Sequence, residues 1–155
     1  MSAMKREKNL PAGAIPAMES PPPAGAPLMS STVVAGFPSP AEQYVERPLD
    51  LNELLVARPA ATYFVRAAGD SMCGAGVQDG DLLVVDRSLE PEDGSMVIAC
   101  VDGEFTVKTY RRGRGGVRLE AANPAYPPIR FAGEMELRVF GVVTAVVHRL
   151  VAREP

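Results

Sequence analysis

Ser71 stands in a short turn that could present a reactive hydroxyl. The turn, Gly69-Asp70-Ser71-Met72, directly follows a strand-like run that begins at Thr62. A turn in this place would hold the serine hydroxyl and the next backbone N–H at the edge of a sheet, where a nucleophile can work. Asp-Ser turns are also common in proteins without a catalytic function, so a serine that only closes the turn is the alternative.

Lys108 is the second group with suitable chemistry, because a neutral amine can take the proton from a serine hydroxyl. It lies within the run from Glu104 to Tyr110, in which β-type alternation places it on the same face as Thr106. Phe105 and Val107 lie on the opposite, apolar face. The same pattern is typical of a solvated lysine on the polar face of a strand, so the spacing by itself assigns Lys108 no function.

Other familiar catalytic and metal-binding patterns are absent from the sequence, which has no HExxH, no GxSxG and no phosphate-binding glycine loop. The single histidine, His148, is the alternative base of a Ser-His-Asp triad, although its place after an apolar run is that of a strand-end surface histidine. Cys73 and Cys100 lack the neighbouring cysteines or histidines of a metal site. We interpret Cys73 as a packing or turn residue, and we expect no metal and no cofactor.

The elements that would position these residues are predicted to be almost entirely β. Runs rich in β-branched and aromatic residues indicate strands at residues 62–67, 81–86, 96–101, 104–110, 117–121 and 137–147. Asp102-Gly103 predicts a tight hairpin between two of them. A short helix through residues 51–55, N-capped by Asp50 and ended by Pro59, precedes the strands. The predicted fold class is mostly β, a compact domain of antiparallel strands with one short helix.

The first 47 residues differ in composition from the rest of the chain. Eight of the 15 prolines fall within the first 40 residues, and a segment of this kind is expected to be extended or disordered. We therefore divide the chain into a flexible N-terminal arm, residues 1–47, and a folded domain, residues 48–155. Within the arm, residues 31–37 form a short β-prone run that could dock as a strand.

Composition also limits the partners and the cellular location that we expect for the protein. The net charge of −3 gives no electrostatic support for direct nucleic-acid binding. Two cysteines are too few for a disulfide framework, which favours a reduced, cytoplasmic protein. No stretch approaches the ~18 apolar residues of a membrane span, and we expect no membrane association. Residues 137–147 are apolar at nearly every position, which favours a covered sheet or a dimer interface.

Ordered blocks of residues along most of the chain closely resemble the UmuD proteins. These blocks are Gly36-Phe37-Pro38-Ser39-Pro40-Ala41, Tyr44-Val45-Glu46, Asp50-Leu51-Asn52, Ala61-Thr62-Tyr63-Phe64-Val65, Gly69-Asp70-Ser71-Met72, Asp79-Gly80-Asp81-Leu82-Leu83, Val101-Asp102-Gly103-Glu104-Phe105-Thr106-Val107-Lys108 and Phe140-Gly141-Val142-Val143. The resemblance covers about residues 35–150, and the occurrence of all blocks in order is highly specific. UmuD proteins belong to the LexA-like family of self-cleaving serine peptidases.

The resemblance implies a chain that cuts itself with a serine and an unprotonated lysine. By position, the nucleophile is Ser71, the general base is Lys108 and the scissile bond is Ala35-Gly36. The bond is Ala-Gly, as in LexA, where UmuD has Cys-Gly, and the arm before it is longer and richer in proline. The backbone N–H groups of Ser71 and Met72 are the candidates for an oxyanion hole.

A lysine base must be covered, because desolvation favours the neutral amine. We expect the apolar residues 33–35 to provide this cover when the arm is in place. Cleavage within one chain and cleavage between two chains both remain open. The roughly 12 residues from Gly36 to Pro48 can span about 40 Å when extended, which is comparable to the diameter of such a domain.

The resemblance also implies partners. UmuD-like proteins form homodimers, are triggered by RecA nucleoprotein filaments and, once shortened, join a UmuC-like Y-family DNA polymerase in error-prone translesion synthesis during the SOS response. One alternative is a non-catalytic polymerase-binding module, which would not need Ser71 and Lys108 together. The other is a LexA-type repressor. Residues 1–35 are too short and too rich in proline to form the helix-turn-helix domain of such a repressor.

Overall fold

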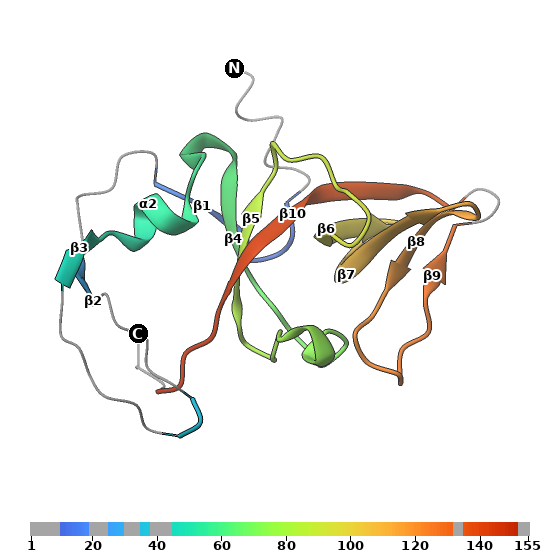
Figure 1. Ribbon diagram of the computed structural model, residues 1–155. Helices are drawn as coiled ribbons and strands as arrows, with labels where there is room; N and C mark the ends of the chain where they lie inside the picture. Colours follow the sequence, from blue (N-terminus) through green and yellow to red (C-terminus); the bar gives the residue numbers. More distant parts are fainter. Residues whose placement is uncertain (1–9, 19–24, 30–34, 38–44, 132–134, 152–155) are drawn as a thin grey trace, which may run out of the picture.

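The computed structural model describes residues 10–18, 25–29, 35–37, 45–131 and 135–151. Eight strands form one antiparallel sheet (Figure 1), and this confirms the mostly β fold class. Their spatial order is β1 (Ile15–Pro16), β4 (Thr62–Arg66), β5 (Leu82–Asp86), β10 (Leu137–Val147), β6 (Met96–Val101), β7 (Glu104–Gly113), β8 (Gly116–Glu120) and β9 (Ile129–Arg130). Within the described ranges, the helical segments are too short and too polar to span a bilayer.

The remaining elements precede or interrupt this sheet. A separate antiparallel pair consists of β2 (Ala26–Met29) and β3 (Val45–Leu49), and the helical segments are α2 (Leu51–Leu55), η2 (Pro59–Ala61) and η3 (Cys73–Ala75). Helix α2 has its predicted N-cap, since the Asp50 side chain accepts a hydrogen bond from Asn52 N–H. The predicted strands are confirmed as well, although β7 extends to Gly113.

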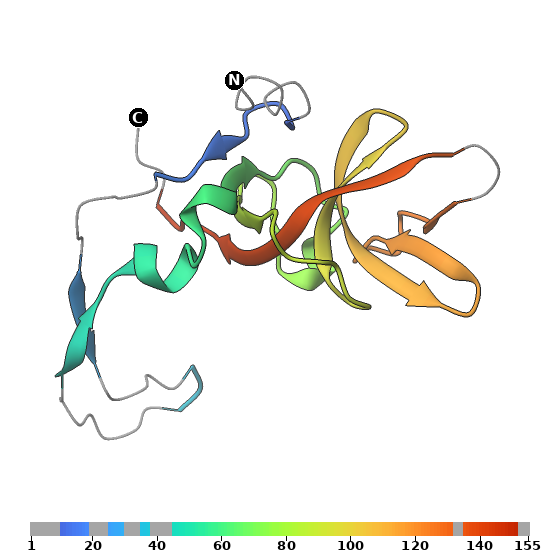
Figure 2. The ribbon, with the colours of Figure 1, turned by 90° about the horizontal axis from the view of Figure 1, so that it is seen from above.

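Strand β10 lies at the centre of the sheet and joins its two halves. The C-terminal half of β10 pairs with β5 and its N-terminal half pairs with β6, so the strand crosses the molecule in both views (Figures 1 and 2). Gly141 lies where β10 passes from β6 to β5. A larger residue would be too close to β5 there, because a Cβ atom on Gly141 would lie 2.7 Å from Val85 Cγ1. Phe140 and Gly141 are buried at this crossing, whereas most other residues of β10 are half-buried, so the sheet covers the apolar run at residues 137–147 only in part.

The core has two parts, one in each half of the sheet. The cluster nearer the Ser71 turn consists of Val65, Ala67, Met72, Val77, Leu83, Val85, Ile98 and Phe140. The other lies among β6, β7 and β8 and consists of Val97, Ala99, Tyr110 and Leu119. Burial of these side chains drives the strands together, and the first cluster supports the turn that carries Ser71.

The hairpin between β6 and β7 forms at the predicted dipeptide. Asp102 and Gly103 both have positive φ, 48° and 85°, as a two-residue hairpin turn requires. The turn pairs Val101 with Glu104 and, further along, Val97 with Lys108. The tight turn therefore fixes the register in which Lys108 lies opposite Val97 of β6.

The arm contains strands that the sequence analysis did not predict. Strand β1 pairs with β4 and strand β2 pairs with β3, although Pro16, Pro27 and Pro48 argue against strands at these places. Each of these pairs lies at an edge, where a missing N–H costs no ladder hydrogen bond. Of the β-prone run at residues 31–37, only 35–37 fall within the described residues, where they form an exposed bend. The division at residue 47 stays a prediction.

Candidate active site

Ser71 lies in a turn that begins where β4 leaves the sheet. Gly69 has φ +86°, a conformation that favours glycine, and its N–H donates to Asp79 Oδ1 at 2.7 Å. On the other side of Ser71, the Met72 side chain is only 2% exposed and packs in the first core cluster. The turn is therefore held at one end by a hydrogen bond and at the other by apolar burial, with Ser71 half-buried between them.

The loop that follows β8 holds the same turn from the outside. Ala122 N–H donates to the Ser71 carbonyl at 2.8 Å, and the Ala122 carbonyl accepts from Gly74 N–H at 2.8 Å. A Cβ atom on Gly74 would lie 2.5 Å from the Ala122 carbonyl oxygen, so only glycine fits there. The sequence analysis missed this support, because no local pattern links Ala122 to a turn 51 positions earlier.

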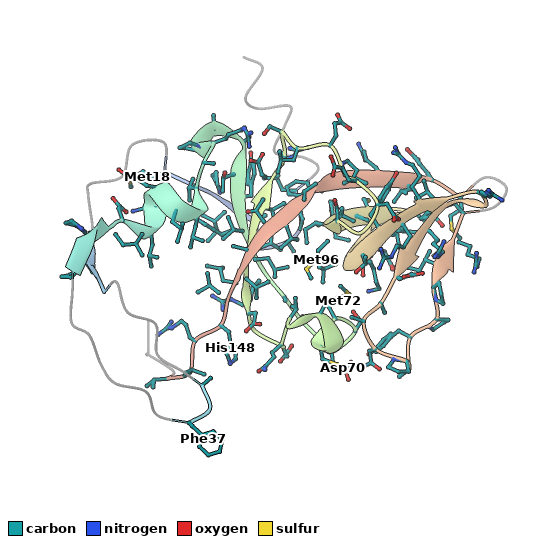
Figure 3. The ribbon with its side chains drawn as sticks, viewed as in Figure 1. Met18, Phe37, Asp70, Met72, Met96 and His148 are labelled. Carbon is teal, nitrogen blue, oxygen red and sulfur yellow. The ribbon has the colours of Figure 1, made fainter. Side chains whose placement is uncertain are left out.

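Tyr126, from the same loop, fixes the residue before the nucleophile. Its hydroxyl donates to Asp70 Oδ1 at 2.6 Å, across 56 positions of sequence. This hydrogen bond to the Asp70 carboxylate raises the pKa of Tyr126. The labelled side chains of Asp70 and Met72 in Figure 3 mark the place of the turn at the lower side of the sheet.

Lys108 reaches Ser71 from β7. Its Nζ lies 3.0 Å from Ser71 Oγ, 2.7 Å from Thr106 Oγ1 and 3.1 Å from the Val107 carbonyl oxygen. The residue is only 7% exposed. The pattern-based interpretation of a solvated lysine is wrong, because the face of β7 that carries Lys108 and Tyr110 is covered and Phe105 on the opposite face is 36% exposed.

The surroundings of Lys108 favour its neutral form. Desolvation by burial lowers the pKa of the amine, and within the described residues no carboxylate forms an ion pair with it. A neutral amine has two N–H groups and one lone pair, which matches the three partners. The N–H groups can donate to Thr106 Oγ1 and the Val107 carbonyl, and the lone pair can accept the Ser71 hydroxyl proton.

The two candidate oxyanion donors are available. Over the described ranges, neither Ser71 N–H nor Met72 N–H donates to a protein acceptor. Ser71 lines a cavity of about 440 Å³ together with Val65, Ala68, Ile98 and Thr106. Ser71 thus lines a cavity and has the Lys108 amine 3.0 Å from its Oγ, an arrangement that suits acyl transfer.

The predicted scissile bond does not lie in this cavity. Ala35, Gly36 and Phe37 are exposed, and Phe37 is 91% exposed. Nothing lies within 4 Å of the place where a Cβ atom on Gly36 would be, and Phe37 lies well away from Met72 in Figure 3. Residues 33 and 34, which were expected to cover Lys108, fall outside the described residues.

His148, the alternative base, has a different partner. Its Nδ1 bonds to Asp81 Oδ1 at 2.5 Å, and its side chain is 41% exposed. Cys73 is exposed, with Sγ 3.9 Å from the Ala122 carbonyl oxygen. Neither residue makes a hydrogen bond to Ser71 within the described part of the chain.

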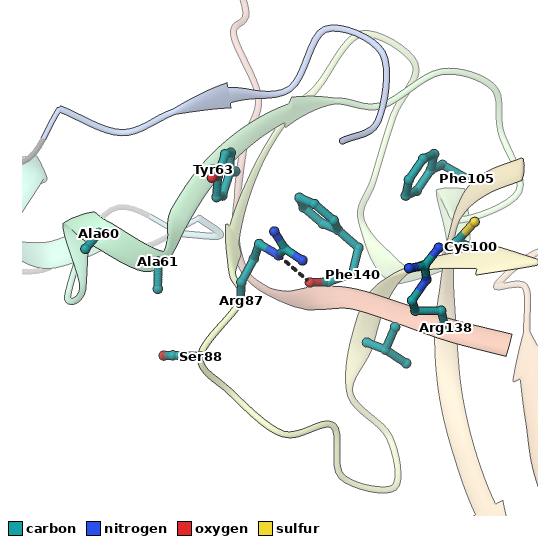
Figure 4. Close-up of a pocket in the computed structure, with 10 residues that line it drawn as sticks. Ala60, Ala61, Tyr63, Arg87, Ser88, Cys100, Phe105, Arg138 and Phe140 are labelled. Carbon is teal, nitrogen blue, oxygen red and sulfur yellow. Dashed lines mark hydrogen bonds between the residues drawn. The ribbon is translucent and has the colours of Figure 1, made fainter. Parts of the chain in front are cut away.

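A second cavity, of about 430 Å³, is lined by aromatic and arginine side chains (Figure 4). It shares Phe105 with the Ser71 cavity, and Arg87 Nε donates to the Phe140 carbonyl at its wall. Ser88 also lines it, but the Ser88 hydroxyl donates to Asp86 Oδ1 at 2.6 Å. A serine hydroxyl paired with a carboxylate in this way lacks the amine that Ser71 has.

Comparisons with known proteins agree with the chemistry of the first cavity. The family model described as Peptidase S24-like matches residues 27–144. Protein SamA of Salmonella typhimurium is 51% identical over 124 residues, which cover 80% of this chain and 86% of SamA. Protein MucA of Escherichia coli is 51% identical over 119 residues, covering 76% of this chain and 81% of MucA. LexA repressor 1 of Xanthomonas oryzae pv. oryzae is 39% identical over 118 residues, covering 76% of this chain and 58% of the repressor.

Proposed function

The chain belongs to the S24-like peptidase family, and from that premise we propose that it is a UmuD-type protein that cuts its own Ala35-Gly36 bond. The observation that carries the proposal is the distance of 3.0 Å between Lys108 Nζ and Ser71 Oγ in a buried site. A serine beside an amine without a neighbouring carboxylate has little structural value, because burying an amine is costly. The pair makes sense as nucleophile and base.

The proposed reaction begins with proton transfer. Neutral Lys108 takes the proton of Ser71 as Oγ attacks the carbonyl carbon of Ala35, and the oxyanion accepts hydrogen bonds from Ser71 N–H and Met72 N–H. The Lys108 ammonium then gives its proton to the nitrogen of Gly36 as the C–N bond breaks. This leaves an ester between Ser71 and Ala35 and a free amino group on Gly36.

Water completes the proposed reaction. Lys108 takes a proton from the water that attacks the ester, and the proton then passes to Ser71 Oγ as the ester bond breaks. The products are residues 1–35 with a free carboxylate and a shortened chain that begins at Gly36. Because Ala35 and Gly36 are exposed and the next residue, Phe37, lies well away from Met72 in Figure 3, the bond must first move into the cavity, either in its own chain or in a second copy.

The cut is tested by incubating the purified protein at mildly alkaline pH and measuring fragment masses. We expect a product that begins at Gly36, and no product from Ser71→Ala. Cys73→Ser is the matched control, because it changes the nearest other nucleophile and should be cut like the parent. A dominant cut elsewhere would contradict the site, and persistent cutting in Ser71→Ala would move the nucleophile.

The cellular function proposed for the shortened chain is that of an accessory subunit. It would form a homodimer, join a UmuC-like Y-family DNA polymerase in the cytoplasm and assist error-prone synthesis across lesions, with RecA nucleoprotein filaments as the trigger of cleavage. Family membership supports this function. The test compares the chain that begins at Gly36 with full-length Ser71→Ala in a lesion-bypass reaction. Stimulation by the shortened chain alone is expected, and equal stimulation by both would contradict activation by cleavage.

A further inference from the structure

One segment of the arm before the scissile bond, residues 10–17, lies against the eight-stranded sheet. Strand β1 pairs Ile15 with Phe64 and Pro16 with Tyr63, and Ala17 N–H continues the ladder by donating to the Thr62 carbonyl at 2.9 Å. Ala17 is 8% exposed, whereas the next residue, Met18, is 65% exposed. Figures 1 and 2 show β1 beside β4, the strand that leads directly to the Ser71 turn.

The N-terminal end of this segment lines the same cavity as Ser71. Pro11 is buried, and Pro11 and Ala12 line the same cavity of about 440 Å³ as Ser71 and Thr106. Leu10 and Ala14 pack against the core cluster that contains Met72. Residues 10–17 thus pair with the edge of β4 that faces away from β5, and Pro11 and Ala12 form part of the wall of the cavity beside Ser71.

The segment also carries the same dipeptide as the proposed scissile bond. Ala12-Gly13 repeats Ala35-Gly36, but it sits in a tight turn in which Ala14 N–H donates to the Pro11 carbonyl at 3.0 Å and Gly13 has φ +78°. A peptide bond is attacked only when its carbonyl carbon is presented to the nucleophile in line at about 3–3.5 Å. A turn closed by its own hydrogen bond resists that presentation.

We propose that residues 10–17 are a built-in competitor for the peptide-binding groove that runs along β4 to Ser71. The groove binds an extended segment rich in alanine and proline by strand addition, and its occupant here must leave before the Ala35-Gly36 segment can reach Ser71 Oγ. This inference rests on the proposed self-cleavage, because it assigns a regulator to that reaction. Once residues 10–17 have left the groove, the segment of the arm around Ala35-Gly36 can bind there as the substrate.

Competition of this kind has a calculable effect on rate. The observed rate equals the rate of the open form multiplied by the fraction of molecules in which the groove is free. A segment that occupies the groove 90% of the time slows cleavage about tenfold. Because the segment is tethered, its effective concentration at the groove is on the order of millimolar, so a modest intrinsic affinity is sufficient.

The first test removes the competitor and follows the cut. A chain that begins at Met18 should be cut at Ala35-Gly36 about tenfold faster than the full chain, and a synthetic peptide of residues 10–18 should restore the slow rate. An unchanged or slower cut in the shorter chain would overturn the proposal. A product beginning at Gly13 from the full chain would overturn it too, because the segment would then be a substrate.

A second test measures the binding of residues 10–18 to the groove in a protein that is not cut. A fluorescent peptide of residues 10–18 should bind the Ser71→Ala chain that begins at Met18, and should bind full-length Ser71→Ala at least about tenfold more weakly, because its groove is filled. Equal affinity for both chains, or no binding to the shorter one, would overturn the proposal. If no form of the protein is cut but the peptide binds as expected, the proposed function fails and the docking stands.

A matched pair of substitutions tests the contact in the full chain. Ala17→Asp places a carboxylate at a position that is 8% exposed, whereas Met18→Asp places the same charge at the next position, which is 65% exposed. Burial of an unpaired carboxylate is costly, so Ala17→Asp should raise the cleavage rate several-fold and Met18→Asp should leave it at the parental value. Equal rates in the two variants would overturn the proposed docking of β1.

Discussion

Two basic side chains of this sheet face potential proton-transfer partners, and their surroundings differ in kind. Lys108 is 7% exposed and lies near two hydroxyls and a carbonyl, without an ion pair among the described residues. The His148 side chain is 41% exposed and is bound to the Asp81 carboxylate, which is 2% exposed. One base is buried away from charge, and the other is half in solvent beside an anion.

The difference shows why residue type is a poor guide to the base. The imidazole of His148 is held by its hydrogen bond to the Asp81 carboxylate, and it makes none to Ser71 within the described residues. An amine buried without a counter-charge is driven toward the neutral form that can accept a proton, and burial lowers the pKa of Lys108 in that direction. In this chain the lysine has the environment of a base, and the histidine is a hydrogen-bonded structural partner of Asp81.

The largest expected effect separates the two bases directly. Lys108→Arg should reduce the self-cleavage rate at least about 100-fold, because a guanidinium does not lose its proton in the working range and general-base catalysis contributes 10²-fold or more. His148→Ala should be cut at the parental rate. Fragment masses over time provide the measurement, and an active arginine variant or an inactive His148→Ala would reverse the comparison.

The pH dependence sharpens the same contrast. If neutral Lys108 is the base, the rate rises about tenfold per pH unit below its pKa and levels off above it. Because burial lowers this pKa, the plateau should begin below the pH at which an exposed lysine, with a pKa of about 10.4, would titrate. His148→Ala should keep the same profile. A profile that is flat from pH 6 to 10 would remove lysine from the base position.

A smaller effect is expected from the group that orients the amine. Thr106→Val removes the hydroxyl 2.7 Å from Lys108 Nζ and keeps the shape of the side chain. The loss of one hydrogen bond of about 1 kcal/mol should slow cleavage about fivefold, and Thr106→Ser should restore the rate. Since the hydroxyl acts through the amine, the pH of the plateau should also shift in Thr106→Val. A slower rate that serine does not restore would indicate a packing effect instead.

How much of this could be predicted from sequence depends on how local the signal is. Asp102-Gly103 predicted the β6–β7 hairpin, because the two positive φ angles of such a turn favour these residues. Alternation in β7 correctly paired Lys108 with Thr106 on one face but assigned that face to solvent. The Ser71 turn lies on that face, with Ser71 Oγ 3.0 Å from Lys108 Nζ, and periodicity within one strand does not report on a distant turn.

The remaining parts of the site come from residues distant in sequence. Ala122 and Tyr126 support the Ser71 turn through contacts that leave no local pattern. Strand β1 was missed although its signal is local. Its residue Pro16 argues strongly against a strand, and an edge position tolerates that proline. Family resemblance identified Ser71 and Lys108 where the pattern did not, and their catalytic functions stay predictions.

The smallest effect on cleavage is expected from substitution in the Asp81–His148 pair, which should change the stability of the fold instead. Asp81 accepts a hydrogen bond from Gln78 N–H at 2.8 Å and one from His148. The backbone bond from Gln78 and then the bond from His148 lower the pKa of Asp81. A carboxylate whose pKa is lower in the folded than in the unfolded chain binds fewer protons when folded. Its stabilisation is complete above the unfolded value of about 3.9 and is lost as the pH falls through the folded pKa.

Asp81→Asn should therefore lower the unfolding midpoint at pH 7 by on the order of a few degrees, while the cleavage rate at a temperature where both proteins are folded stays parental. The asparagine side-chain oxygen can still accept the Gln78 N–H, so the turn keeps its shape and only the charge-assisted part of the stabilisation is lost. The difference in midpoint between the parent and the variant should shrink as the pH is lowered below about 4, because the parental carboxyl then becomes protonated as well. Thermal unfolding of both proteins at the two pH values is the measurement. A difference that stays constant with pH would show that the Asp81 charge is not what stabilises the pair. A loss of cleavage in the folded variant would show that the His148 region takes part in the chemistry, and the contrast with Lys108 would fail.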